Sequence, residues 1–253
     1  MQESLSEKFH KFSQDDAADE LQAACLVAQT LEPKLDFRDL QRRLGVLVDD
    51  CDNADEPWLY LQEIGFVGNE DDYAAVENSR IDLVVQSKCG IPITLGVVLL
   101  HVARQLGHTT HGVNFPGHFL VRIDADLVDP FHMRRTTEAQ WLRGSDVSAE
   151  EAFASASAQT IALRMLNNLK WNFAGLGNWD LALDILDYQI VIDPAAPQLH
   201  LERGEFWVSL GAIGAARHCF EEVVALANPL EPKIAALAKA RLAALSEIKE
   251  VLH

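Results

Sequence analysis

The 253-residue sequence predicts an α+β protein that is mostly helical and carries a small antiparallel sheet. Three observations favour this class. Apolar residues recur at helical spacing near the N-terminus, one long apolar helix precedes several short strand candidates, and the C-terminal part repeats a helical pattern. We therefore expect a helical extension over residues 1–80, a core domain over residues 81–158 and a helical array over residues 159–253.

The N-terminal extension carries helical periodicity in two places. Residues 16–31 place their apolar side chains at i, i+3, i+4 and i+7, and residues 37–48 repeat this pattern with leucines. Residues 65–73 are rich in Gly, Asn and Asp, which indicates a loop. The extension is therefore predicted to end in irregular structure just before the core begins.

One helix is predicted to form the centre of the core domain. Pro92 suits the first turn of this helix, and Gly107 marks its end. The residues between them are apolar on nearly every side, so we expect the helix to be buried. Strand candidates follow at residues 111–115, 118–123 and 127–131, and together they predict an antiparallel meander.

The turn at Asp124 decides which residues of the last two strands face one another. A two-residue turn at Asp124 and Ala125 pairs Leu120 with Asp129, and it makes His118 and Asp129 diagonal neighbours on one face. A three-residue turn shifts the register by one residue and moves the carboxylate to the other face. The sequence leaves both turn lengths open.

The C-terminal part repeats itself at an interval of 34 residues. Gly177 and Ala182 in the first unit match Gly211 and Ala216 in the second, and a closing helix is expected over residues 234–252. This repeat length is typical of the tetratricopeptide fold. We expect the matched small residues to lie where adjacent helices touch, and the array to bind a protein partner.

The charge balance excludes several partners. With 21 basic and 38 acidic side chains, the formal net charge is −17, and such a surface repels phosphate backbones and anionic lipids. We therefore expect no nucleic-acid and no membrane partner.

Cysteine and histidine spacing predicts the compartment and the absence of a cofactor. The sequence has no signal segment, and its four cysteines form neither a metal pattern nor a dense disulfide framework, so we expect a reduced, cytoplasmic protein. Four histidines cluster between residues 101 and 118, but their spacing matches no zinc motif. We expect neither a metal nor another cofactor.

Three residues could carry chemistry. Cys89 comes just before the buried helix, where free N–H groups and the helix dipole favour a thiolate; His118 heads one strand and Asp129 lies on the next. Such a set can supply a nucleophile, a base and an orienting carboxylate. Each also has a structural interpretation: a small buried side chain for Cys89, a histidine bound to backbone groups for His118, and a turn for Asp129 before proline.

The core resembles the transglutaminase-like (papain-like) domain of a bacterial family that carries tetratricopeptide repeats, and a related domain of a vertebrate F-box protein. The runs that carry the resemblance are 65–73, 89–96, 102–107, 113–122 and 128–131. The resemblance implies that His118 and Asp129 occupy the base and orienting positions of active relatives. It puts the nucleophile near Pro92, with Thr94 close by, which is later in the chain than Cys89. It therefore implies a core that keeps the fold and lacks the nucleophile.

Two functions remain open. The first is a non-catalytic protein-interaction or regulatory protein built on a degenerate core plus tetratricopeptide repeats. The second is a thiol hydrolase or acyl transferase, protease-like or transglutaminase-like, that uses Cys89, His118 and Asp129. A Cys89 sulfur within about 4 Å of a His118 ring nitrogen, with that ring bound to Asp129, would favour the enzyme.

Overall fold

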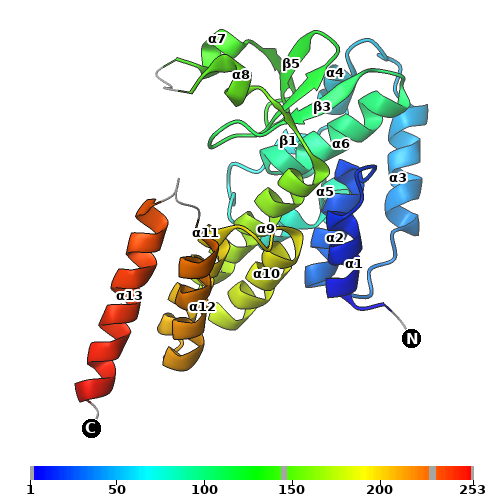
Figure 1. Cartoon of the computed structure of the whole chain (residues 1–253). Coiled ribbons are helices and arrows are strands. Elements are labelled where there is room, and N and C mark those ends of the chain that lie inside the picture. The colour runs from blue at the N-terminus through cyan, green and yellow to red at the C-terminus, as the bar shows by residue number, and fades with distance from the viewer. Residues whose placement is uncertain (1–2, 144–146, 228–231, 252–253) are drawn as a thin grey trace. The chain divides into compact units, whose positions relative to one another are not determined.

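The chain forms two compact units, Met1–Asn168 and Leu169–His253. A computed structural model describes residues 3–143, 147–227 and 232–251 (Figure 1). The boundary between the units falls inside the long helix α9 (Ala158–Gly175). Within the described ranges, no helix is both long and apolar enough to cross a membrane.

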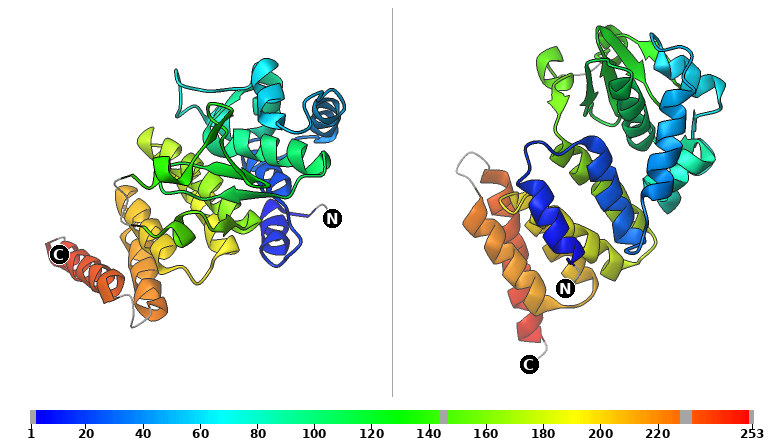
Figure 2. Two further views of the ribbon diagram at one scale, coloured as in Figure 1. Left: turned by 90° about the horizontal axis from the view of Figure 1, so that it is seen from above. Right: turned by 90° about the vertical axis from the view of Figure 1, so that its right-hand side faces the viewer.

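Helix α6 (Pro92–Gln105) is the centre of the first unit. Nearly all of its residues are buried, because its side chains are apolar on every side and neighbouring elements cover them. Three N-terminal helices pack against it, namely α2 (Glu20–Leu31), α3 (Arg38–Asp49) and α4 (Pro57–Glu63). Strands β3 (Thr110–Val113) and β4 (Leu120–Ile123) also pack against it (Figure 2). The helix ends at a left-handed glycine, Gly107, whose φ is +98°.

The N-terminal helices begin where the sequence supplies caps. Ser4 and Asp19 each accept a hydrogen bond from the backbone three residues later, and Glu7 and Gln22 complete the two capping boxes. The helices of the first unit other than α6 and α9 are all shorter than α6. Their bounds are α1 (Leu5–Ser13), α2 (Glu20–Leu31), α3 (Arg38–Asp49), α4 (Pro57–Glu63), the 3₁₀ helix η1 (Val76–Ser79), α5 (Ile81–Ser87), α7 (Glu138–Trp141) and α8 (Ala149–Ala152).

The main sheet has five antiparallel strands in the order β6-β5-β4-β3-β7. The three central strands form the predicted meander, and the two edge strands add to it. The strand bounds are β3 (Thr110–Val113), β4 (Leu120–Ile123), β5 (Asp126–Asp129), β6 (Arg134–Thr136) and β7 (Ser155–Ala156). A separate parallel pair joins β1 (Val67–Gly68) to β2 (Cys89–Gly90).

The turn between β4 and β5 has two residues. Ile123 pairs with Asp126, and Val121 pairs with Val128, so continuation of the ladder places Leu120 opposite Asp129. Asp124 adopts a φ of +50° to make this tight connection. Of the two registers that the sequence left open, the structure has the one that puts His118 and Asp129 on the same face.

The second unit consists of helices. The C-terminal end of α9 is followed by α10 (Trp179–Ile192), α11 (Pro197–Ser209), α12 (Ile213–Leu226) and α13 (Pro232–Val251), and consecutive helices from α10 onward pack together. Helix α13 corresponds to the expected closing helix, whose last expected residue lies outside the described residues.

The repeated glycines of this unit serve the backbone rather than helix contact. Gly177 and Gly211 both have φ of +74°, and a Cβ added at either would meet nothing within 4 Å. The expectation that they mark the closest helix contacts is therefore wrong for these two positions, because the turns need a left-handed residue. Close approach occurs at Gly204 instead, where a Cβ would lie 2.4 Å from the ring of Phe220.

Candidate functional site

His118 and Asp129 are joined directly. The Nε2 atom of His118 lies 2.9 Å from Oδ1 of Asp129, and Asp129 is only 2% exposed. His118 itself lies in a bend two residues before β4, not in the strand as the sequence suggested. The reason is the turn at Gly117, whose φ is +76°, because that turn uses the N–H of His118 to bind the carbonyl of Phe115.

A second histidine binds the same carboxylate. His132 Nδ1 lies 2.7 Å from Oδ2 of Asp129, and the backbone N–H of Phe131 donates to Oδ1 at 3.1 Å. Burial alone would raise the pKa of Asp129, but the hydrogen bonds from His118 and His132 outweigh burial and hold that pKa below its ordinary value. Asp129 is thus a buried carboxylate with a partner on each oxygen.

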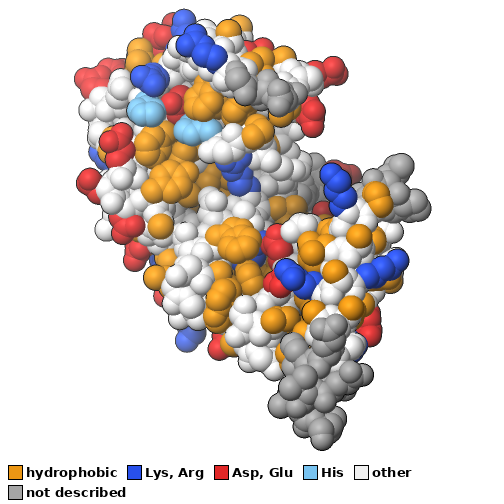
Figure 3. Space-filling view, turned by 90° about the vertical axis from the view of Figure 1, so that its left-hand side faces the viewer, with side chains coloured by type: hydrophobic (Ala, Val, Ile, Leu, Met, Phe, Trp, Pro, Cys, Tyr) orange, Lys and Arg blue, Asp and Glu red, His pale blue; other side chains and the backbone are white. Residues whose placement is uncertain are grey.

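Aromatic rings line the surface beside this carboxylate. The ring of His118 stacks on Trp141, with centroids 4.6 Å apart and an interplanar angle of 27°. Phe131 lies 6.5 Å from His118 and 6.1 Å from Tyr73, again between ring centroids. We call these four side chains, Tyr73, Phe131, His118 and Trp141, the aromatic strip. Figure 3 shows histidine side chains set among hydrophobic ones on one face of the molecule.

Cys89 is not joined to His118. Strand neighbours point to opposite faces, and β1 and β2 pair Val67 with Cys89 and Gly68 with Gly90. A Cβ on Gly68 would lie 2.4 Å from the Phe131 ring, whereas a Cβ on Gly90 would lie 2.9 Å from Thr94 Oγ1 and from Val84 Cγ1. Cys89 therefore projects from the face of β2 opposite to the one that Thr94 and Val84 cover.

The sulfur of Cys89 makes no hydrogen bond with any described residue, and the local contacts of Cys89 are backbone bonds with the Ser87 hydroxyl. Thr94 does not replace it. Its hydroxyl is fully buried and is engaged with the backbone of Ile91, to which it donates at 3.1 Å.

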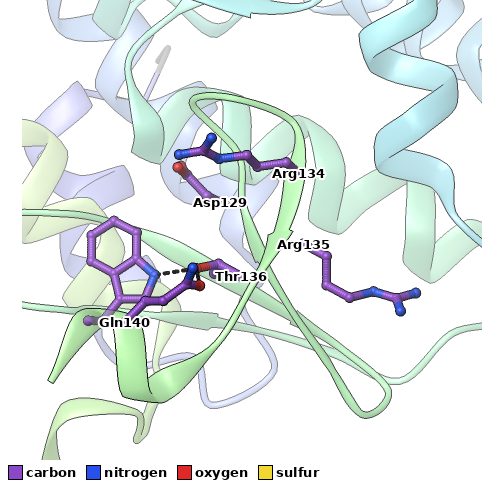
Figure 4. Close-up of a pocket in the computed structure, with 6 residues that line it drawn as sticks. Asp129, Arg134, Arg135, Thr136 and Gln140 are labelled. Atoms are coloured by element: carbon purple, nitrogen blue, oxygen red, sulfur yellow. Dashed lines mark hydrogen bonds between the residues drawn. The ribbon is translucent and has the colours of Figure 1, made fainter. Parts of the chain in front are cut away.

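A cavity of about 340 Å³ opens beside Asp129. Arg134 pairs with Asp129 across β5 and β6, and its side chain lines the same cavity without an ion pair to any described carboxylate (Figure 4). Arg135 points away and pairs with Glu56 at 2.8 Å. The indole N–H of Trp141 donates to Thr136 at 2.9 Å. The lining residues are Asp129, Arg134, Arg135, Thr136, Gln140 and Trp141.

The arrangement can hold a base and its orienting carboxylate, but no thiol or hydroxyl of the described residues makes a hydrogen bond with that base. Within the described ranges, no group of three or more His, Cys, Asp or Glu side chains has an arrangement that could hold a metal ion. What the site presents outward is the aromatic strip and a few polar groups, which is an arrangement suited to binding.

Sequence reasoning missed several residues of this site. His132 follows Asp129 by three residues, and a turn starting at an aspartate could have indicated that they meet. Trp141 and Tyr73 reach the site from distant segments, and no local pattern in the sequence indicates this.

The sequence is similar to that of known proteins. Residues 58–167 match the family model of the transglutaminase-like superfamily. A UPF0162 protein of Xylella fastidiosa is 36% identical over 173 residues, which cover 62% of this chain and 62% of that protein. A UPF0162 protein of Pseudomonas aeruginosa is 30% identical over 203 residues, 75% of each chain. The chain belongs to the UPF0162 family.

The similarity extends beyond bacteria. F-box only protein 21 of Homo sapiens is 28% identical over 176 residues, which cover 61% of this chain and 27% of that much longer protein. The alignment with the Xylella protein leaves more than a third of that relative uncovered. No solved structure matches the chain significantly.

Proposed function

We propose that this protein is a non-catalytic protein-interaction or regulatory protein, built on a transglutaminase-like core that lacks its nucleophile. The observation that carries the proposal is that the Cys89 sulfur makes no hydrogen bond to His118 or to any other described residue. In enzymes with a Cys-His pair, the thiol is activated by a histidine within hydrogen-bonding reach. The His118–Asp129 pair then serves to fix the aromatic strip.

The C-terminal helices would form a short tetratricopeptide array that binds a protein. Two features support this. Gly177 and Gly211, 34 residues apart, adopt the same φ of +74° before α10 and α12, and Ala182 and Ala216 are both fully buried at matching positions. Arrays of this kind present surfaces for protein partners.

The test of the proposal is the reactivity of Cys89. With Cys25, Cys51 and Cys219 replaced by Ser, the rate of iodoacetamide labelling is measured from pH 5 to pH 9. We expect slow labelling at pH 6, no faster than that of a simple thiol, and the same profile in the His118→Ala variant. In the unmodified chain, Cys25 and Cys219 would add little to the labelling rate, since burial raises the pKa of Cys25 to about 12 and that of Cys219 to about 11.

The alternative is a thiol hydrolase or acyl transferase that uses Cys89, His118 and Asp129. The 2.9 Å contact between His118 and Asp129 favours it, since this is the base and orienter of such enzymes. An inflection in the labelling rate below about pH 7 that disappears in His118→Ala would establish the enzyme and overturn the non-catalytic proposal.

A further inference from the structure

Arg164 lies beside the loop that leads to His118. It belongs to the part of α9 inside the first unit, and its Nη1 donates to the carbonyl of Phe115 at 2.9 Å and to the side chain of Asn114. These bonds tie the guanidinium to the loop between β3 and β4. Its position is therefore fixed relative to His118, which follows in the same loop.

The charge of Arg164 has no counterion among the residues that the structure describes. Its side chain is partly buried, and it makes no ion pair with any described carboxylate. Burial lowers the pKa of Arg164, and the neighbouring Tyr73 is the group that opposes this effect. A guanidinium withdrawn from water without an anion is unfavourable. Among the described residues, Arg164 therefore lacks the anion that would balance its charge.

The rest of the guanidinium is open to a ligand. Neither Nε nor Nη2 makes a hydrogen bond, and neither is among the enclosed, unpartnered polar atoms of the described residues, so solvent reaches them. A planar pair of N–H groups in this state matches the two oxygens of a carboxylate.

Arg164 is linked to the aromatic strip through Phe115 and by the effect of its charge on Tyr73. The ring of Phe115, whose carbonyl binds Arg164, lies 5.5 Å from the ring of Trp141. At the other end, Tyr73 is 52% exposed and lies close enough for the Arg164 charge to oppose the rise in its pKa that burial causes. A cation therefore lies along a partly exposed apolar surface, in a protein whose net charge is −17.

We propose that Arg164 and the aromatic strip together recognise a peptide segment of a partner protein in which a hydrophobic side chain is adjacent to a carboxylate. The strip accepts the hydrophobic side chain, and the free edge of Arg164 binds the carboxylate. This rests on the proposed function only in treating the site as a binding site. The carboxylate belongs either to an acidic side chain or to a peptide C-terminus, and the chemistry of recognition is the same for both.

Three capped dipeptides test the proposal. Acetyl-Asn-Phe-amide is neutral, acetyl-Asp-Phe-amide carries a side-chain carboxylate, and acetyl-Asn-Phe with a free C-terminus carries a terminal one. Binding to the full chain is followed by NMR, through the Nε–H signal of Arg164 and the indole signal of Trp141. We expect at least one acidic peptide to bind about ten-fold more tightly than the neutral one, with shifts at both signals. The acidic peptide that binds identifies the source of the carboxylate.

Variants separate recognition from a purely structural role of Arg164. Arg164→Gln should abolish the preference for the acidic peptide, whereas Arg42→Gln, which removes an exposed positive charge on α3, should keep it. Asn114→Ala removes one bond that holds Arg164 but leaves the guanidinium, so the preference should survive. Should Arg164→Gln fail to fold, the wild-type titration still decides, because carboxylate binding must weaken as salt is raised to 0.5 M.

Equal affinity for the three peptides, shifts that avoid Arg164, or a preference that persists in Arg164→Gln would overturn the proposal. None of these results bears on the reactivity of Cys89. A reactive Cys89 together with a carboxylate preference would instead make the same surface a substrate site, so the two proposals fail separately.

Discussion

His118 Nε2 lies 2.9 Å from Asp129 Oδ1, across a two-residue turn that brings their strands into register. The same carboxylate also binds His132, so it holds two imidazole rings at once. The ring of His118 also stacks on Trp141, whereas the sulfur of Cys89 makes no hydrogen bond to any described residue.

The first prediction concerns Asp129. Because its folded pKa is lowered, the carboxylate contributes stability above its unfolded pKa of about 3.9, and that contribution is lost as pH falls through the folded pKa. Asp129→Asn should therefore cost about 1–3 kcal/mol in the free energy of unfolding at pH 7. Urea denaturation at pH 7, 5 and 3 should show the gap to wild type narrowing below about pH 4. A gap that does not change with pH would contradict this assignment.

The second prediction concerns His108, which has acceptors on both ring nitrogens. Asp124 Oδ2 lies 2.6 Å from Nδ1, and the carbonyl of Ala54 lies 2.6 Å from Nε2. The hydrogen bond to Asp124, followed by that to Ala54, raises the pKa of His108 above its ordinary value. Its stabilising effect is then complete below the unfolded pKa of about 6.5 and is lost as pH rises through the folded pKa.

His108→Gln should consequently be less stable than wild type at pH 6, and this difference should shrink toward pH 9. Denaturation across that range measures the difference, and an NMR titration of His108 gives its folded pKa directly. A titration midpoint at or below about 6.5 would show that these contacts do not stabilise the charged ring.

The central helix and the meander could be predicted from the sequence, because apolar composition and turn residues act locally. The register could not, since the turn uses Asp124 at a φ of +50° where a glycine would have signalled the turn type. The edge strands β6 and β7 are short, and β6 is polar, so they carry no alternation to detect.

One part of the candidate site could also be predicted from the sequence, and another part could not. His118 and Asp129 are close in sequence, and His118 lies two residues before the strand that pairs with the strand of Asp129, so a choice of turn length was enough to bring them together. The surroundings of Cys89 depend on its pairing with Val67, which lies earlier in the chain. Arg164 comes from a helix after the sheet. Packing between segments far apart in the sequence decides the positions of Cys89 and Arg164, and the spacing of residues in the sequence does not indicate that packing.

The third prediction concerns the contact between α6 and the sheet. A Cβ on Gly96 would lie 2.6 Å from the ring of Phe119, which is fully buried. Gly96→Ala should overpack this contact and lower the free energy of unfolding by about 1–3 kcal/mol. Gly45→Ala is the matched control, because the helical Gly45 has nothing within 4 Å of an added Cβ; it should raise stability by up to about 1 kcal/mol. Urea denaturation measures both, and a neutral Gly96→Ala would mean that Phe119 has room to move.

The last prediction concerns the glycines of the second unit. Gly177 and Gly211 share a φ of +74° with open space around each, so Gly→Ala at either position adds backbone strain without a clash. Each change should cost about 1–2 kcal/mol in the free energy of unfolding, and the two costs should agree within about 0.5 kcal/mol if the turns are equivalent. Gly177→Asn should cost less than Gly177→Ala, because asparagine tolerates the left-handed conformation. Thermal and urea unfolding of the full chain measure these differences. Equal costs for Ala and Asn, or unequal costs at the two glycines, would show that the two turns are not a repeated element.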